Sequence, residues 1–158
     1  MIGNDIVDLS LAKAESNWKR RGFLDKIFTK NEQLLISKAQ NPEIMVWDLW
    51  SRKEAAYKIY NRQTGIREFI PLKLECFDVY AEIGKVSYKK QVYFTKTEIT
   101  EHYIHTLSVI NMSDFNKISV LDNATPIKKS NGLPFIGFNN QIVSLSHHGK
   151  FQRIVTFL

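Results

Sequence analysis

The chain has 158 residues, of which 44% are hydrophobic and 24% charged, values that are ordinary for a soluble globular protein. This length supports one hydrophobic core, so we expect a single domain over residues 1–158. The net charge of +6 suits phosphate-bearing ligands, acidic proteins or nucleic acid, but the absence of a basic tail, zinc-ligand spacing and an RNA-binding aromatic signature argues against a nucleic-acid partner.

The sequence also bears on the compartment. Polar residues interrupt the amino terminus, which therefore lacks the apolar run of a signal peptide. No stretch approaches the roughly 20 apolar residues that a membrane span needs. The lone Cys76 has no partner for an internal disulfide, as is usual in a reducing compartment. We therefore expect a cytoplasmic protein with no membrane association.

Local signals predict an amino-terminal strand followed by three helices. The expected ranges are residues 1–7 for the strand and 10–21, 29–39 and 41–60 for the helices. Ser10 and Gly22 are suited to begin and end the first helix. Thr29 and Glu32 have capping-box spacing at the start of the second. Asn41, which a proline follows, is the expected N-cap of the third.

The second half of the chain consists of β-branched and aromatic runs separated by turn residues. The expected strands cover residues 72–80, 85–95, 103–110, 117–121, 141–145 and 151–158. Helices early in the chain and strands later predict an α+β fold, with a mostly antiparallel sheet packed against three helices.

A helical wheel of the third predicted helix places a lysine among apolar residues. The apolar stripe consists of Val46, Leu49, Trp50, Tyr57 and Tyr60. Lys53 lies in the middle of this stripe, Glu54 and Lys58 lie at its border, and Arg52 is expected to face outward. An inward lysine is costly unless it is paired or close to a ligand. The alternative is a snorkelling lysine beside an ordinary surface Glu–Lys pair.

The segment Gly3-Asn4-Asp5 interrupts the apolar amino-terminal strand with a carboxylate. A carboxylate in this setting suits a hard cation such as Mg²⁺, which prefers oxygen ligands. The alternative is an acid that forms a turn or caps a helix.

A third polar cluster is Ser144-Leu145-Ser146-His147-His148. Alternation along a strand places Ser144, Ser146 and His148 on one face and the other two residues on the opposite face. Hydroxyl and imidazole groups near a turn can bind phosphate oxygens. A hydrolase is disfavoured because no nucleophile-elbow pattern surrounds the serines, and a zinc site is disfavoured by the ligand spacing.

In this order the three segments resemble the 4′-phosphopantetheinyl transferase superfamily. Its pattern is a Gly-x-Asp near the start, a Trp/Phe-x-x-Lys-Glu-Ala-x-x-Lys helix and a Ser-x-Ser-His, found here at residues 3–5, 50–58 and 144–147. The Ser-x-Ser-His at the carboxyl end is similar to the short holo-acyl-carrier-protein synthase branch. Residues 76–124 are longer than in that branch and are assigned to extra strands, while Trp50 is more similar to the long branch.

The resemblance implies transfer of 4′-phosphopantetheine from coenzyme A to a serine of an apo acyl carrier protein, with release of 3′,5′-ADP. It implies that Asp5 and Glu54 bind Mg²⁺ and that Lys58 assists the departing 3′,5′-ADP, so these three residues would be catalytic. The residues implied to bind coenzyme A are Lys53, Lys58, Thr64, Gly65, Ser146 and His147. The proton of the carrier serine would pass to Glu54 or to a metal-bound water.

The resemblance also suggests partners. Basic residues of the first helices, including Arg20 and Arg21, would dock an acidic carrier protein. Short-branch relatives are trimers, so self-association is expected, with a trimer as the first candidate. Two other functions fit the same residues: a non-catalytic basic module that binds nucleic acid or a protein on a degenerate transferase scaffold, and an enzyme with another phosphate substrate.

Overall fold

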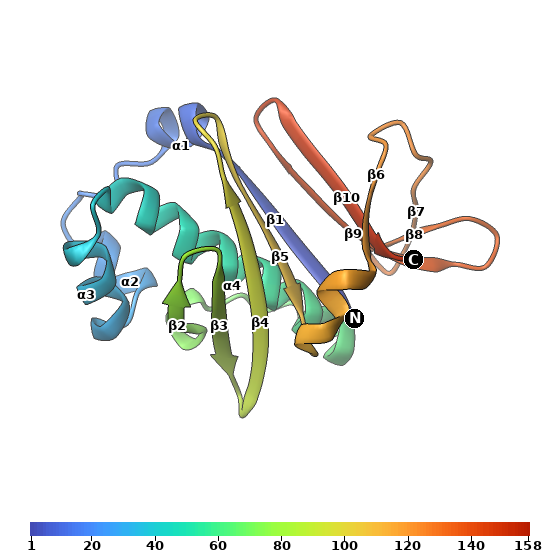
Figure 1. Ribbon diagram of the computed structural model, residues 1–158, viewed down its shortest axis with the longest axis horizontal. Coiled ribbons are helices and arrows are strands. Elements are labelled where there is room, and N and C mark those ends of the chain that lie inside the picture. Colours follow the sequence, from blue (N-terminus) through green and yellow to red (C-terminus); the bar gives the residue numbers. More distant parts are fainter.

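The computed structural model describes residues 1–158 and contains two five-stranded antiparallel sheets together with four α-helices (Figure 1). The first sheet has the order β1 (Ile2–Asp8), β5 (Tyr103–Val109), β4 (Gln91–Ile99), β3 (Ile83–Tyr88) and β2 (Glu75–Tyr80). The second has the order β6 (Ile118–Leu121), β10 (Phe151–Phe157), β9 (Gln141–His148), β8 (Leu133–Ile136) and β7 (Lys128–Ser130). The predicted α+β class is confirmed.

The helices are α1 (Leu9–Glu15), α2 (Phe23–Ile27), α3 (Lys30–Lys38) and α4 (Pro42–Thr64), and two short 3₁₀ turns cover Pro71–Lys73 and Met112–Lys117. In Figure 1, α2 and α3 lie at one end of the molecule and the second sheet lies at the other. None of the helices combines the length and the apolar character that crossing a membrane would need.

Two of the three helix starts agree with the predictions. The capping box of α3 is present: Thr29 Oγ1 accepts from Glu32 N (3.3 Å), and Glu32 Oε2 accepts from Thr29 N (2.8 Å). Asn41 Oδ1 caps α4 by accepting from Ile44 N, and the helix ends at Gly65 in the left-handed conformation, one turn later than predicted.

The first helix differs from its prediction. Its N-cap is Asp8, whose carboxylate accepts from Leu11 N, rather than Ser10, because β1 leads directly into the helix. The helix also ends at Glu15 instead of residue 21. Ser16 and Asn17 follow this end, and such short polar side chains compete with the backbone hydrogen bonds of a helix. A separate helix, α2, begins after Gly22.

Two errors in the predicted strands concern turns. The predicted strand 85–95 is in fact parts of β3 and β4, joined by a turn at Lys89 and Lys90, both with positive φ (46° and 67°). Lysine is not a typical residue for this conformation, so the turn left no signal. The hairpin of β7 and β8 was also not predicted, since its strands are short and β8 contains Pro134.

The long helix α4 packs against β1 at very short range, and Gly3 makes this approach feasible. A Cβ at Gly3 would overlap the carbonyl oxygen of Ala55 in α4. Only glycine allows the two backbones to lie this close. Residues close to this contact in sequence are therefore brought together: Asp5 in β1, and Glu54 and Lys58 in α4.

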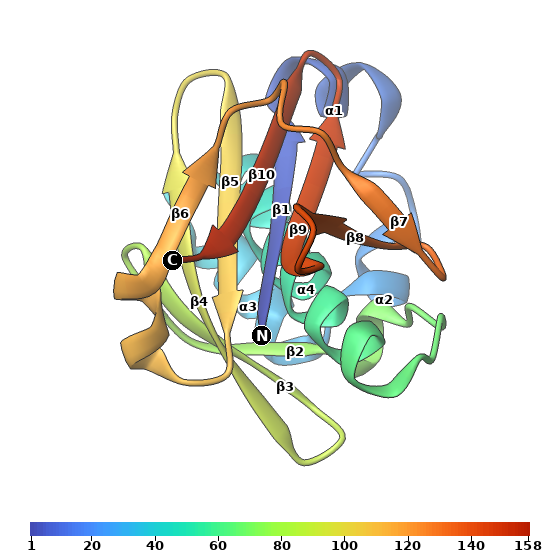
Figure 2. The ribbon, with the colours of Figure 1, turned by 90° about the vertical axis from the view of Figure 1, so that its right-hand side faces the viewer.

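The second sheet is attached to β1 by side chains of β9. Alternate backbone N–H groups of β1 donate to these side chains: Asn4 N to Ser144 Oγ (2.9 Å), Ile6 N to Ser146 Oγ (3.0 Å) and Asp8 N to His148 Nδ1 (2.9 Å). Figure 2 shows β1 running alongside β9 and β10. The predicted placement of Ser144, Ser146 and His148 on one face is confirmed, and these side chains replace a backbone ladder along one edge of β1.

Candidate active site

A cavity of about 430 Å³ lies where β1, α4 and β9 meet, and α1 and α2 close one side of it. Five of the predicted site residues line it: Asp5, Glu54, Lys58, Ser146 and His147. From α4 it is lined by Trp47, Trp50, Glu54 and Lys58, which are spaced as one face of a helix. This face extends over about 16 Å and changes from aromatic through acidic to basic.

Asp5 is held in place from two sides. Its Oδ1 accepts from Ser146 Oγ (3.1 Å) and lies 3.8 Å from Lys58 Nζ. Its Oδ2 is buried and has no hydrogen-bond partner. Burial raises the pKa of Asp5, and the charge of Lys58 and the hydrogen bond from Ser146 oppose this shift. A buried carboxylate oxygen without a partner is a favourable position for a cation.

The negative charge of Asp5 acts on Glu54. Burial first, and then the negative charge of Asp5, raise the pKa of Glu54 to about 7, while Lys58 opposes the shift. No group of three or more His, Cys, Asp or Glu side chains is arranged to hold a metal ion. The donors available here are thus two carboxylates, which suits Mg²⁺, since this ion usually takes its remaining ligands from water and substrate phosphates.

Lys58 links the three elements around the cavity. Its ammonium donates to the carbonyl oxygens of Asn4 in β1 (2.7 Å) and Leu145 in β9 (3.3 Å). The side chain is 30% exposed and lines the cavity. A cation fixed in this way can bind a phosphate oxygen without much loss of side-chain entropy.

The remaining wall comes from the end of β9. His147 is exposed and lines the cavity. His148 accepts from Asp8 N through Nδ1, so the neutral ring carries its proton on Nε2, which lies 3.6 Å from Glu15 Oε2. His148 thus serves mainly to hold β9 against β1.

Lys53 is not at the cavity, and its predicted contact with phosphate is not supported. Its ammonium is completely buried and donates to Glu32 Oε2 (2.7 Å) and to the carbonyl oxygens of Ile27 (2.7 Å) and Pro71 (2.8 Å). These three bonds use all the donors of a lysine. The wheel correctly placed Lys53 inward, but its partner is Glu32 rather than a ligand.

Three further predicted positions differ. Thr64 and Gly65 lie at the end of α4, where the Thr64 hydroxyl donates to Tyr60 O and Gly65 ends the helix, and neither lines the cavity. Arg52 is buried rather than outward-facing, because the first sheet covers its side of α4. Its guanidinium binds Asp48 (2.8 Å) and Thr95 Oγ1 (2.8 Å).

The sequence interpretation missed the aromatic end of the cavity. Phe23 of α2 and Trp47 of α4 line it, with ring centroids 6.4 Å apart in an edge-on arrangement. Trp47 could have been identified, because it precedes Trp50, Glu54 and Lys58 by three, seven and eleven positions, the spacing of one helix face. Phe23 comes from another helix and left no comparable signal.

Behind the site, His105 of β5 gives the protein a predictable response to acid. The side chain is 6% exposed, and its Nε2 lies 3.3 Å from Asn4 Nδ2. Burial, followed by the charges of Arg153 and Lys58, lowers the pKa of His105 from 6.5 to about 4. The unfolded state therefore binds more protons between these values, and stability falls as the pH decreases from 6.5 to 4, by about 3 kcal/mol.

We expect His105→Gln to remove this part of the acid sensitivity. The measurement is the free energy of unfolding by urea between pH 7 and pH 4. His102→Gln, at an exposed position, is the control and should leave the profile unchanged. If the free energy of unfolding fell as steeply toward pH 4 in His105→Gln as in the wild type, the assignment would be contradicted.

Comparison with known proteins agrees with these observations. Residues 1–114 match the family model described as the 4'-phosphopantetheinyl transferase superfamily. The fold is similar to that of Helicobacter pylori holo-[acyl-carrier-protein] synthase (AcpS) in complex with coenzyme A, with a TM-score of 0.56 and 18% identity over 70% of this chain and 100% of that chain. None of the curated proteins compared with the chain matches it in sequence.

The match to the family covers well over half of the chain and includes Gly3, Asp5, Glu54 and Lys58, but it ends before Ser146. It confirms the resemblance that the motifs suggested. The chain belongs to the 4'-phosphopantetheinyl transferase superfamily, and is accordingly a 4'-phosphopantetheinyl transferase.

Proposed function

We propose that this protein transfers the 4′-phosphopantetheine group of coenzyme A to a serine of an apo acyl carrier protein and releases 3′,5′-ADP. The observation that carries the proposal is the cavity itself, which brings Asp5, Glu54 and Lys58 together beside the histidine-bearing end of β9. A pair of coupled carboxylates beside a fixed lysine suits a pyrophosphate substrate that arrives with a divalent cation.

Asp5 and Glu54 would hold Mg²⁺, with substrate and water as the other ligands. When bound, the ion would polarise the pyrophosphate and offset the negative charge that develops during transfer. The free Oδ2 of Asp5 and the raised pKa of Glu54 support this assignment, because a cation relieves the repulsion between the two carboxylates.

A cytoplasmic location accords with the free, buried thiol of Cys76.

In the reaction, the oxygen of the carrier serine forms a bond to the β-phosphorus, and the bond from that phosphorus to the bridging oxygen of 3′,5′-ADP breaks. The serine proton passes to Glu54 or to a water beside it. Lys58, fixed by two carbonyl oxygens, stabilises the charge of the leaving group. His147, at the exposed mouth of the cavity, contacts the phosphates of coenzyme A.

Thermal unfolding in the presence of coenzyme A tests ligand binding directly. At a coenzyme concentration of about 100 Kd with Mg²⁺ present, we expect Tm to rise by about 5–10 °C. Asp5→Asn should lose most of the part that depends on Mg²⁺, whereas Glu68→Gln, at an exposed position, should behave as the wild type. An equal shift in Asp5→Asn would count against the metal assignment, and no shift in the wild type would count against the proposed substrate.

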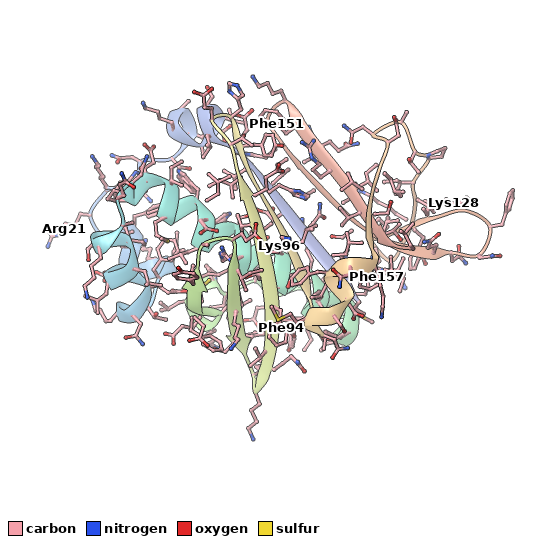
Figure 3. All side chains as sticks on the ribbon, in the orientation of Figure 1. Arg21, Phe94, Lys96, Lys128, Phe151 and Phe157 are labelled. Atoms are coloured by element: carbon pink, nitrogen blue, oxygen red, sulfur yellow. The ribbon has the colours of Figure 1, made fainter.

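The carrier would dock on the basic segment between α1 and α2. Arg20 and Arg21 are exposed there, and Figure 3 shows Arg21 pointing away from the body of the molecule. We expect Arg20→Glu combined with Arg21→Glu to raise the KM for the carrier about tenfold with little change in kcat. Lys128→Glu combined with Lys129→Glu, at the far end of the molecule, is the matched control (Figure 3). An unchanged KM in the arginine variant would show that the carrier does not dock on this segment.

A further inference from the structure

A second groove, of about 420 Å³, lies between the two sheets and is separate from the candidate active site. Ile104 of β5 belongs to the core that α4 covers, so the next residue, His105, points to the opposite face of the first sheet. This face forms one wall of the groove and β6 contributes to the other; Figure 1 shows the two sheets diverging here. The groove and the active-site cavity have no lining residue in common.

The first sheet contributes two cross-strand pairs to the groove. Lys96 of β4 lies opposite Leu107 of β5, and Glu98 lies opposite His105. Partners in register share one face of a sheet, so these four side chains form a continuous patch. Val120 of β6, which is 58% exposed, lines the groove from the second sheet. The groove thus combines apolar surface with groups that can form hydrogen bonds.

The charges of the groove favour a neutral or basic ligand. Its lining contains the carboxylates of Glu82 and Glu98 but only one ammonium, that of Lys96, which lies 3.5 Å from Glu82 Oε1. The negative charges therefore outnumber the positive ones, and an anionic ligand such as a phosphate or a nucleic acid would be repelled.

His105 presents one unused hydrogen-bond donor to this groove, although the residue is only 6% exposed. Its Nε2 accepts from Asn4 Nδ2, which also donates to Arg153 O. Burial lowers the pKa of His105 to about 4, so the ring is neutral at pH 7 and carries its proton on Nδ1. Nδ1 makes no hydrogen bond within the protein and is not fully enclosed by it, so this N–H opens onto the groove that His105 lines.

β6 has a free edge beside the same groove, since it pairs with β10 and with no other strand. Leu158 N donates to Lys117 O, which makes these opposite residues a hydrogen-bonded pair. Antiparallel pairs alternate between bonded and non-bonded, so Ser119 is bonded to β10 as well. The N–H and C=O groups of Ile118 and Val120 therefore point away from β10. Such an unpaired edge can accept another strand.

We propose that this groove binds an extended segment of a partner protein, neutral or basic in charge, which pairs with the free edge of β6. The N–H and C=O of Val120 bond to the backbone of the segment, and one of its oxygens accepts from His105 Nδ1. An apolar side chain of the segment packs between Val120 and Leu107. The inference concerns a surface separate from the active site, so it does not depend on the proposed function.

The first test uses a blocked peptide as the probe, acetyl-Thr-Val-Lys-Val-Thr-amide, and follows the backbone amides of the ¹⁵N-labelled protein by NMR. We expect saturable shifts at millimolar peptide that include the amides of Val120, His105 and Leu107, together with a newly observable His105 Nδ1 proton. The peptide with Glu in place of Lys should bind more weakly. No shifts at these amides, or equal affinity of the two peptides, would overturn the proposal.

The second test removes the backbone donor at the edge. Val120→Pro deletes an N–H that points away from β10 and leaves the bonds of the β6–β10 ladder in place, and it should weaken peptide binding about tenfold. Val120→Thr, which keeps the N–H, is the matched control and should bind as the wild type does. Equal affinity in the proline variant would contradict strand addition.

Two further measurements guard against a misfolded variant and a different occupant. A peptide methylated on its central backbone nitrogen should bind the unmodified protein more weakly than the parent peptide, and equal binding would again overturn strand addition. Sedimentation without peptide gives the mass of the wild type and of Val120→Pro. A wild-type dimer that Val120→Pro dissociates would show that a second copy occupies the edge, which would also overturn the proposal. None of these experiments involves coenzyme A, so the proposal can fail while the proposed function stands.

Discussion

Glu54→Gln is expected to lower transfer by about a thousandfold and, at the same time, to stabilise the metal-free protein at pH 8. The loss of transfer follows from removing one of only two carboxylates available for the cation, a change of the size seen when a main electrostatic contact of a transition state is lost. The gain in stability follows from the cost of burying a second negative charge beside Asp5.

The sign of the stability effect depends on pH. The pKa of Glu54 rises from 4.5 to about 7 on folding, so the native state binds more protons than the unfolded state between these values. Stability contributed by this group is therefore present below pH 4.5 and is lost as the pH rises to about 7, with a total of about 3 kcal/mol. Glutamine has no charge to bury, so the variant should lose this part of the pH dependence.

The measurement is urea unfolding of both proteins at pH 5 and pH 8 in the presence of a chelator, with transfer assayed in parallel. Glu68→Gln is the control for loss of an exposed carboxylate and should change neither property. Two results would refute the assignment: retention of transfer in Glu54→Gln, or a fall in stability from pH 5 to pH 8 that is as large in the variant as in the wild type.

Lys53→Met should lower the free energy of unfolding by about 3–5 kcal/mol, the range for removing one member of a buried ion pair. The reason is that the carboxyl group of Glu32 would remain completely buried without the cation that pairs with it. Glu32 also accepts from Thr29 N and Cys76 N, so it ties the start of α3 to β2 as well as to α4. The loss should therefore weaken the packing of α3 against the rest of the core.

Lys30→Met is the matched control, because its pair with Asp25 has a similar length (3.0 Å) but is exposed on both sides. A change of less than about 1 kcal/mol is expected there. Denaturant unfolding measures both variants, and the transfer rate per folded molecule should change little in either. If Lys53→Met had the stability of the wild type but bound coenzyme A more weakly, Lys53 would be a residue that binds coenzyme A.

Part of the arrangement around Lys53 and Glu54 could be predicted from the sequence alone. The wheel identified Lys53 as inward and Glu54 and Lys58 as neighbours on one face, because helix periodicity is a local property. The wheel could not identify Glu32 as the partner of Lys53. Glu32 lies 21 residues before Lys53 in the chain, and the two side chains meet only through tertiary packing. For the same reason the wheel placed Arg52 outward, although the first sheet covers that side of α4.

The strand patterns have the same limit. Alternation correctly placed Ser144, Ser146 and His148 on one face, yet nothing in their spacing indicated that this face would meet β1. In β1 itself every residue is buried, so alternation could not separate the core side from the site side. The position of Asp5 in the cavity depends on contacts of β1 with α4 and β9, which are separated from it by about 50 and 140 residues.

The most direct test of the proposed function is the mass of a carrier protein. Purified protein is incubated with coenzyme A, Mg²⁺ and an apo acyl carrier protein, and the intact mass of the carrier is measured. We predict a gain of one 4′-phosphopantetheine group on a serine, with one 3′,5′-ADP released for each carrier modified, and no gain with Asp5→Asn. An unmodified carrier, under conditions in which coenzyme A and Mg²⁺ raise the Tm of the wild-type protein, would contradict carrier modification as the function of this cavity.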